Sequence, residues 1–222
     1  MSDSTIIELN NVQIEQQKTV VLKDISLKIE KGEFVYFVGK TGSGKSSLLK
    51  SLYGDVSVNN GAGSVLNCDI IKAKRKKILA LRRKIGIIFQ DFELLTDRSV
   101  ADNLKFIMKA TGWKGKQKIN DSITELLEKV GMSDKANSFP HLMSGGEQQR
   151  IAIARALVND PELILADEPT GNLDPETSIQ IMNLLNKIAS NGKTIVMATH
   201  DYSIIEAFKG RVIKFENQNI SE

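Results

Sequence analysis

The chain has 222 residues, of which 41% are hydrophobic and 26% charged, and its formal net charge is +3 at pH 7. This is the composition of an ordinary globular protein, and so small a net charge does not argue for nucleic-acid binding, which we do not expect. The single Cys68 excludes an internal disulfide and suits a reducing cytosol. We see no signal-peptide pattern and no apolar run of the roughly 18 residues that a membrane span needs, so we expect any crossing to come from another chain.

Four short apolar runs along the chain are each followed by polar residues. They are FVYFV (34–38), IGIIF (85–89), LILA (163–166) and TIVMA (194–198). Continuous apolar runs of this length between helix-like segments are typical of buried parallel strands in an α/β sheet. Because ligands bind outside the carboxyl ends of such strands, we expect the polar residues after the four runs to form one site.

The residues after the first run match a phosphate-binding loop. GKTGSGKS (39–46) fits the pattern G-x-x-x-x-G-K-[ST] and is followed by a helix-like stretch, KSSLLKSLY. In such a loop the backbone N–H groups surround phosphate oxygens, the lysine reaches the β- and γ-phosphates, and the next hydroxyl ligates Mg²⁺. We therefore predict that ATP and Mg²⁺ bind here, with Ser46 as a metal ligand. The predicted nucleotide contacts are Gly39, Lys40, Thr41, Gly42, Ser43, Gly44, Lys45, Ser46 and Ser47.

The other three runs supply candidate catalytic residues. Asp167 and Glu168 follow the third run, where an aspartate can hold Mg²⁺, usually through water, and the adjacent glutamate can orient or deprotonate the attacking water. Gln90 and His200, after the second and fourth runs, are weak signals taken singly. Their shared sheet edge favours roles as sensors of the γ-phosphate or of metal-bound water. We predict Glu168, His200, Lys45 and Gln90 as catalytic, and Asp167 and Gln90 as further metal ligands.

A separate motif, LMSGGEQQR (142–150), precedes another helix-like run. Ser144 stands three residues before Glu147, which predicts a capping box in which each side chain bonds the backbone N–H of the other residue. A capping box does not need Gly145 and Gly146 between its partners. Glycines at the start of a helix leave bare N–H groups for a phosphate. We therefore predict that Ser144 and Glu147 cap the helix, that Gly145 and Gly146 leave its start open to phosphate, and that all four residues contact nucleotide.

In their order along the chain, these motifs resemble those of the ATP-binding cassette (ABC) ATPases. The matching residues are 39–46, Gln90, 144–147, 167–170, 172–174 and His200. They correspond to the family's Walker A, Q-loop, signature, Walker B, D-loop and switch histidine. The resemblance implies an α/β P-loop NTPase core of RecA-like fold with an antiparallel β subdomain (1–90 and 160–222), and an inserted α-helical subdomain (91–159). The local pattern agrees: LKDISLKIE (22–30) alternates like a half-exposed strand.

The resemblance also implies partners. In this family the signature of one copy covers ATP bound to the Walker A of another, which implies a homodimer with ATP at its interface and a nucleotide contact from Asp174. SGGEQQR, ADEPTGNLD and MATHD most resemble the FtsE subfamily of the FtsE, LolD and MacB group. This implies peripheral attachment to the cytoplasmic face of the bacterial inner membrane through an FtsX-like integral protein, and control of peptidoglycan hydrolysis in cell division. A LolD- or MacB-like role in lipoprotein release or efflux is the alternative.

Two features depart from the family pattern. No aromatic residue precedes Phe34, although the family usually stacks one on adenine; Glu15 or Gln16 stands near that position. We therefore predict modest ATP affinity. Basic residues are concentrated in the segment 72–84, which is either a solvated helical face or a surface that electrostatically favours an anionic membrane.

Overall fold

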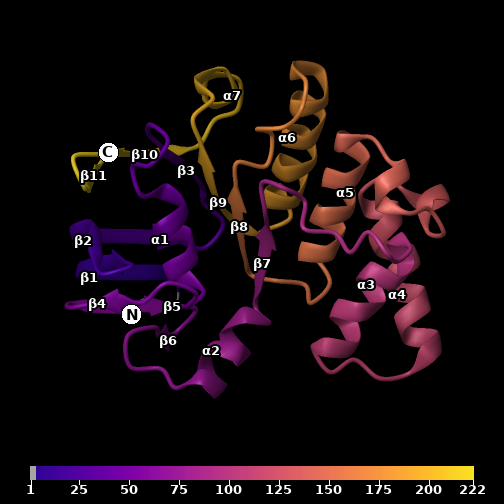
Figure 1. Ribbon diagram of the computed structural model, residues 1–222, viewed down its shortest axis with the longest axis horizontal. Coiled ribbons are helices and arrows are strands. Elements are labelled where there is room, and N and C mark those ends of the chain that lie inside the picture. Colours follow the sequence, from indigo (N-terminus) through magenta and orange to yellow (C-terminus); the bar gives the residue numbers. More distant parts are fainter. Residues whose placement is uncertain (1–3) are drawn as a thin grey trace.

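The computed structural model describes residues 4–222, which form two sheets and seven α-helices (Figure 1). The first sheet is antiparallel, with β1 at its centre and the order β2-β1-β5-β6, and β4 pairs with β1. Its strands are β1 (Thr5–Gln16), β2 (Thr19–Glu30), β4 (Val58–Asn59), β5 (Ala62–Val65) and β6 (Cys68–Asp69).

The second sheet has six strands in the order β11-β10-β3-β9-β8-β7, all parallel except the terminal β10–β11 pair. They are β3 (Phe34–Val38), β7 (Ile85–Ile88), β8 (Leu163–Asp167), β9 (Thr194–Thr199), β10 (Arg211–Glu216) and β11 (Asn219–Ser221). The four apolar runs are therefore confirmed as neighbouring parallel strands, although β7 ends one residue before Phe89. Their carboxyl ends meet at one edge of the sheet.

Helices cover both faces of the six-stranded sheet. They are α1 (Lys45–Leu52), α2 (Arg75–Arg82), α3 (Val100–Ala110), α4 (Lys116–Lys129), α5 (Gly145–Ala156), α6 (Pro175–Ser190) and α7 (Tyr202–Ala207), with 3-10 turns η1 (Ser133–Lys135) and η2 (Pro140–Leu142). Alternate side chains of β3 face opposite ways: Val35 and Phe37 pack with the leucines of α1 and the antiparallel sheet, whereas Tyr36 and Val38 pack with α5 and α6. The sheet thus separates two apolar clusters, and α1 and α5 lie on its opposite sides (Figure 1).

The segment predicted as a helical subdomain contains α3, α4 and α5. Figure 1 shows α3 and α4 beside α5, at the far side of the sheet from the antiparallel strands. Leu104 of α3, Ile123 of α4 and Ile153 of α5 belong to the same apolar cluster as Ile88 of β7. The helices are therefore packed onto the sheet through a continuous core. The boundaries 1–90, 91–159 and 160–222 remain a prediction from the sequence.

Strand β2 has the predicted alternation with one interruption. Ile25, Leu27 and Ile29 are buried at every second position, but Leu22 is also buried, three residues before Ile25. Asp24 has a φ of 55°, and the ladder between β1 and β2 shifts register at this place, as in a β-bulge. The extra residue restores Leu22 to the buried face.

The basic segment 72–84 forms the loop before α2, the helix itself and the residues after it. Lys72, Lys74 and the first turn of α2 are exposed, as in the solvated-face interpretation. Arg82 differs, because its Nε and Nη2 atoms donate to the carbonyls of Tyr53 and Gly54 at 3.0 Å each. None of the described helices combines the length and apolar character that crossing a bilayer requires.

Candidate active site

The loop between β3 and α1 encloses the lysine of the predicted phosphate site. Gly44 has a φ of 102°, and a Cβ there would lie 2.9 Å from Leu22, so both conformation and space require glycine. Lys45, which is only 5% exposed, begins α1 and directs its ammonium back into the loop. Its Nζ donates to the carbonyl oxygens of Gly39 at 2.7 Å and Lys40 at 3.1 Å.

The same loop contains a polar atom suited to a phosphate. The Oγ of Ser43 is buried and has no hydrogen-bond partner within residues 4–222. A buried hydroxyl without a partner is costly, and a phosphate oxygen would satisfy it. Together with Lys45 and the positive φ of Gly42 and Gly44, this hydroxyl fits the loop to a nucleotide's phosphates.

Ser46 and Asp167 meet at the predicted metal site, although they belong to α1 and β8. The Ser46 hydroxyl donates to Asp167 Oδ1 at 2.8 Å. Burial raises the pKa of Asp167, the Ser46 hydrogen bond opposes that shift, and the charge of Glu168 adds to it. The Ser46 hydroxyl and the Asp167 carboxylate supply oxygen ligands, and a nearby cation would stabilise the charged form of this buried carboxylate. These ligands fit a hard cation such as Mg²⁺, which usually takes few protein ligands besides water and phosphate. The described residues contain no cluster of three or more His, Cys, Asp or Glu side chains that fits a metal.

Glu168 lies between a lysine and a histidine. Its Oε2 is 2.9 Å from His200 Nδ1 and its Oε1 is 3.9 Å from Lys45 Nζ, and the side chain is 13% exposed. Glu168 itself has a φ of 48°, and its N–H donates to the carbonyl of Ala198 in β9 at 3.0 Å. The ends of β8 and β9 therefore bring the predicted base and the predicted sensor together.

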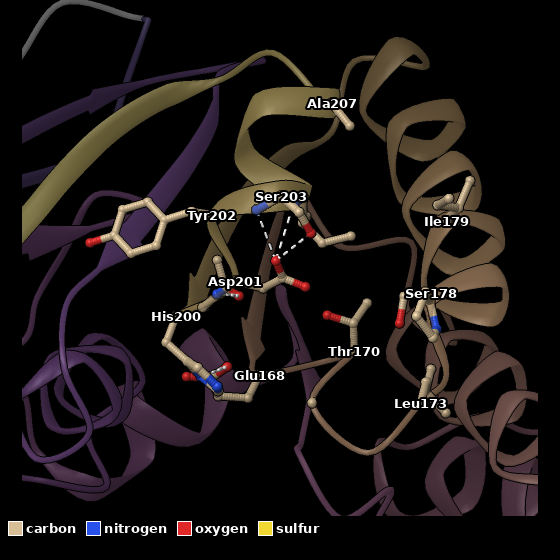
Figure 2. A pocket seen from close by; sticks show the side chains of 14 residues that line it. Glu168, Thr170, Leu173, Ser178, Ile179, His200, Asp201, Tyr202, Ser203 and Ala207 are labelled. Carbon is tan, nitrogen blue, oxygen red and sulfur yellow. Dashed lines mark hydrogen bonds and ion pairs between the residues drawn. The ribbon is translucent and has the colours of Figure 1, made fainter.

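This pair lies at one end of a cleft of about 550 Å³, which continues between α6 and α7 (Figure 2). Asp201, directly after His200, caps α7 from within the cleft. Its Oδ1 accepts from the N–H and hydroxyl of Ser203 at 2.9 and 2.6 Å, and from the N–H of Ile204 at 3.4 Å. These bonds, the Ser203 hydroxyl foremost, lower the pKa of Asp201 and fix the turn that carries His200.

The segment that begins at Gln90 is held from two sides. Asn172 Nδ2 donates to Gln90 O and to Asp91 Oδ1, both at 3.2 Å. The guanidinium of Arg155, at the end of α5, donates to Phe92 O at 2.9 Å and also to Glu93 O. The structure brings Gln90 into hydrogen-bond contact with neither Ser46 nor Asp167 among the described residues, so its role as a metal ligand remains a prediction. Sequence reasoning missed Arg155, since nothing in its local pattern indicates these contacts.

The capping box at the start of α5 is confirmed. Ser144 N donates to Glu147 Oε2 at 2.9 Å, and Glu147 N donates to Ser144 Oγ at 3.3 Å. The glycines between them also serve close packing that the sequence did not predict. A Cβ on Gly146 would lie 2.5 Å from Thr177 Cγ2, and one on Gly145 would lie 3.2 Å from Leu173.

Asp174 caps α6, which starts beside those glycines. Its carboxylate accepts from Thr177 N at 2.9 Å and from Thr177 Oγ1 at 2.6 Å, and these bonds lower the pKa of Asp174. These bonds lie within one chain, so the predicted nucleotide contact of Asp174 stays a prediction. The bonds hold the Asp174 carboxylate at the surface where the first turns of α5 and α6 meet.

Residues 22–171 match the protein-family model described as ABC transporter. The chain belongs to this family. It is 44% identical to the "Cell division ATP-binding protein FtsE" of Streptococcus pneumoniae, over 97% of this chain and 94% of that protein. Identity to the protein of the same name from Mycobacterium tuberculosis is 46%, over 91% and 87% of the two chains. A methionine import ATP-binding protein MetN of Nocardia farcinica is 40% identical, but the match spans 68% of that protein.

Solved structures agree with this assignment. The protein cbiO1 of Clostridium perfringens, described as part of the ABC transporter complex cbiONQ, superposes with a TM-score of 0.90 at 29% identity, over 99% of this chain and 88% of that one. The cassette MJ0796, solved as a dimer in a post-hydrolysis state bound to ADP and Pi, gives a TM-score of 0.86 at 32% identity over 98% and 97%. The family cassette fold predicted from the motifs is confirmed, and this member of the FtsE group is an ATP-binding ATPase.

Proposed function

We propose that the chain is an FtsE-like ATPase that dimerises on ATP and signals through an FtsX-like membrane partner to control peptidoglycan hydrolysis in cell division. The observation that carries the catalytic part is Glu168, held within 2.9 Å of His200 and 3.9 Å of Lys45. A carboxylate so placed can orient and deprotonate a water molecule. Ser46 and Asp167 would hold Mg²⁺, which when bound supplies charge neutralisation on the phosphates.

The proposed dimer places ATP between two copies. The P-loop helix α1 and the signature helix α5 lie on opposite faces of the sheet, which favours a signature that serves another chain's nucleotide. Ser144, Gly145 and Gly146 form a capped helix start, and the N–H groups of such a start favour an anion. Closure would then depend on contacts that exist only while the γ-phosphate is present, so hydrolysis would loosen the dimer.

The proposed partner follows from the relatives named FtsE, which this chain matches over 86–94% of their length. An FtsX-like integral protein would place the ATPase peripherally at the cytoplasmic face of the inner membrane. A LolD- or MacB-like ATPase, driving lipoprotein release or efflux, would have a different membrane partner. Co-purification from membranes distinguishes them, because the FtsE-like role requires an FtsX-like protein and is contradicted by recovery of an export permease alone.

Glu168→Gln tests the catalytic assignment. We expect this variant to bind ATP but to hydrolyse it about 10²–10⁴-fold more slowly, because the general base is lost, and to accumulate as an ATP-bound dimer. The control is Glu206→Gln, which neutralises an exposed carboxylate on α7. Steady-state phosphate release and size-exclusion chromatography with MgATP provide the measurements. Near-normal turnover of Glu168→Gln would show that another group activates the water.

A further inference from the structure

Lys135 contacts the capping box at the start of α5. It ends the turn η1, and its Nζ lies 2.8 Å from Glu147 Oε1. The other carboxylate oxygen of Glu147 accepts the N–H of Ser144. The two side chains are 31% and 27% exposed, so the ion pair sits at the surface beside the helix start. Nothing in the local sequence of η1 distinguishes Lys135 from the other charged residues around it.

Glu147 creates an electrostatic problem for the proposed signature. A helix start favours an anion because of its free N–H groups and its dipole. The carboxylate of Glu147 already occupies part of this helix start, and it would repel an incoming phosphate. Lys135, followed by the N–H of Ser144, lowers the pKa of Glu147, so the carboxylate is charged at neutral pH.

We infer that Lys135 is a positioning residue of the signature, which neutralises Glu147 so that the capping box does not repel the nucleotide of a second copy. The inference rests on the proposed function, in which that nucleotide meets the helix start at Ser144, Gly145 and Gly146. A partly exposed ion pair contributes little to folding stability, typically below about 1 kcal/mol. Stabilisation of the fold therefore does not by itself account for the contact between Lys135 and Glu147. Like charges that face each other across an interface, in contrast, weaken association substantially.

The test is a double-mutant cycle on ATP-dependent dimerisation in the full chain. All variants carry Glu168→Gln, and the dimer dissociation constant is measured with MgATP by analytical ultracentrifugation. Lys135→Met should weaken the dimer about tenfold, equivalent to about 1.4 kcal/mol. Lys135→Arg, which keeps the charge, should restore most of the affinity. In the Glu147→Gln background, Lys135→Met should have an effect of less than about twofold, because no carboxylate is left to neutralise.

The outcomes separate this inference from the proposed function. If the Glu168→Gln chain stays monomeric with MgATP, the proposed dimer is wrong and the role of Lys135 is wrong with it. If that chain dimerises but Lys135→Met weakens the dimer equally with and without Glu147→Gln, only the role of Lys135 is overturned. Equal affinity of Lys135→Met and the parent chain overturns it as well. Thermal melting of each variant checks folding, and Lys135→Gln provides a second neutral substitution with the same expected result.

Discussion

The carboxylate of Asp201 joins a candidate catalytic residue to a helix cap. It accepts three hydrogen bonds from Ser203 and Ile204 one residue after His200. Asp201→Ala should lower the free energy of unfolding by about 1 kcal/mol, the usual cost of losing a helix cap. Asp201→Asn, which keeps an acceptor oxygen, should cost less. Urea denaturation at pH 7 measures both, and an unchanged stability of Asp201→Ala would show that the cap contributes nothing.

The stabilisation by Asp201 should depend on pH in a defined direction. Its pKa in the folded chain lies below the ordinary value of 3.8, because its hydrogen bonds favour the charged form. The contribution is therefore complete above pH 3.8 and is lost as the pH falls through the folded-state pKa. The stability difference between the native chain and Asp201→Asn should be constant from pH 7 to pH 5 and should shrink below pH 3.8. A difference that grows on acidification would contradict this sign.

At the scale of single residues, local motifs were informative and distant contacts were not. The capping box of Ser144 and Glu147 and the P-loop lysine are each visible within a few residues of sequence, because their bonds are local. The meeting of Ser46 with Asp167 was predictable only by resemblance and by the rule that parallel strands end at one edge. Arg155 and Lys135 were missed because their partners are brought near only by the packing of α5.

At the scale of elements, the starts of α5 and α6 are packed too closely for a side chain at Gly146. Gly146→Ala would place a Cβ 2.5 Å from Thr177 Cγ2, so either the Thr177 side chain or one of the two helices must shift. We expect a loss of about 1–3 kcal/mol of stability, as for other overpacked sites. Thr177→Ser removes that methyl group but keeps the hydroxyl that donates to Asp174.

The double variant Gly146→Ala with Thr177→Ser should therefore regain most of the loss seen with Gly146→Ala alone. Thermal melting of the two single variants and the double variant gives the comparison. If the double variant is as unstable as the sum of the single ones, the close contact is not the cause of the glycine requirement at this position.

The contacts in the hairpin of β1 and β2 favour Gln16 over Glu15 as the position nearer the bound nucleotide. Gln16 lies at the hairpin end, and its Oε1 accepts from the hydroxyl of Ser47, next to Ser46 of the P-loop. Glu15 instead accepts from Gln13 along its own strand. Gln16→Tyr should tighten ATP binding roughly 5- to 150-fold, as a base-stacking energy of about 1–3 kcal/mol implies. Glu15→Tyr is the matched control and should change the affinity little; equal effects in fluorescence titrations would contradict this choice.

The sequence predicted elements better than their arrangement. All four apolar runs became strands because a continuous buried run leaves few alternatives. The order β3-β9-β8-β7 could not be read from periodicity, since it depends on which strands find each other across the chain. The bulge at Asp24 in β2 was also missed, because alternation alone does not reveal an inserted residue.

At the scale of the whole molecule, a shared active site makes activity depend on concentration. If the site is complete only between two copies, the turnover per chain should rise with protein concentration until the dimer is saturated. Gly145→Asp should retain ATP binding by the monomer but show low turnover at every concentration, because the signature is blocked. Constant turnover per chain across a wide dilution series of the native protein would contradict a site formed by two copies.

The sheet that separates the two apolar clusters also separates the consequences of sequence change. Leu49 in α1 and Ile153 in α5 belong to different apolar clusters, so substitutions at these two positions act on opposite faces of the sheet. Effects at distant, independent sites add. Substitutions that repack one cluster should therefore be tolerated without compensating changes in the other cluster. In this respect the chain has two cores, which share the six-stranded sheet but tolerate substitutions separately.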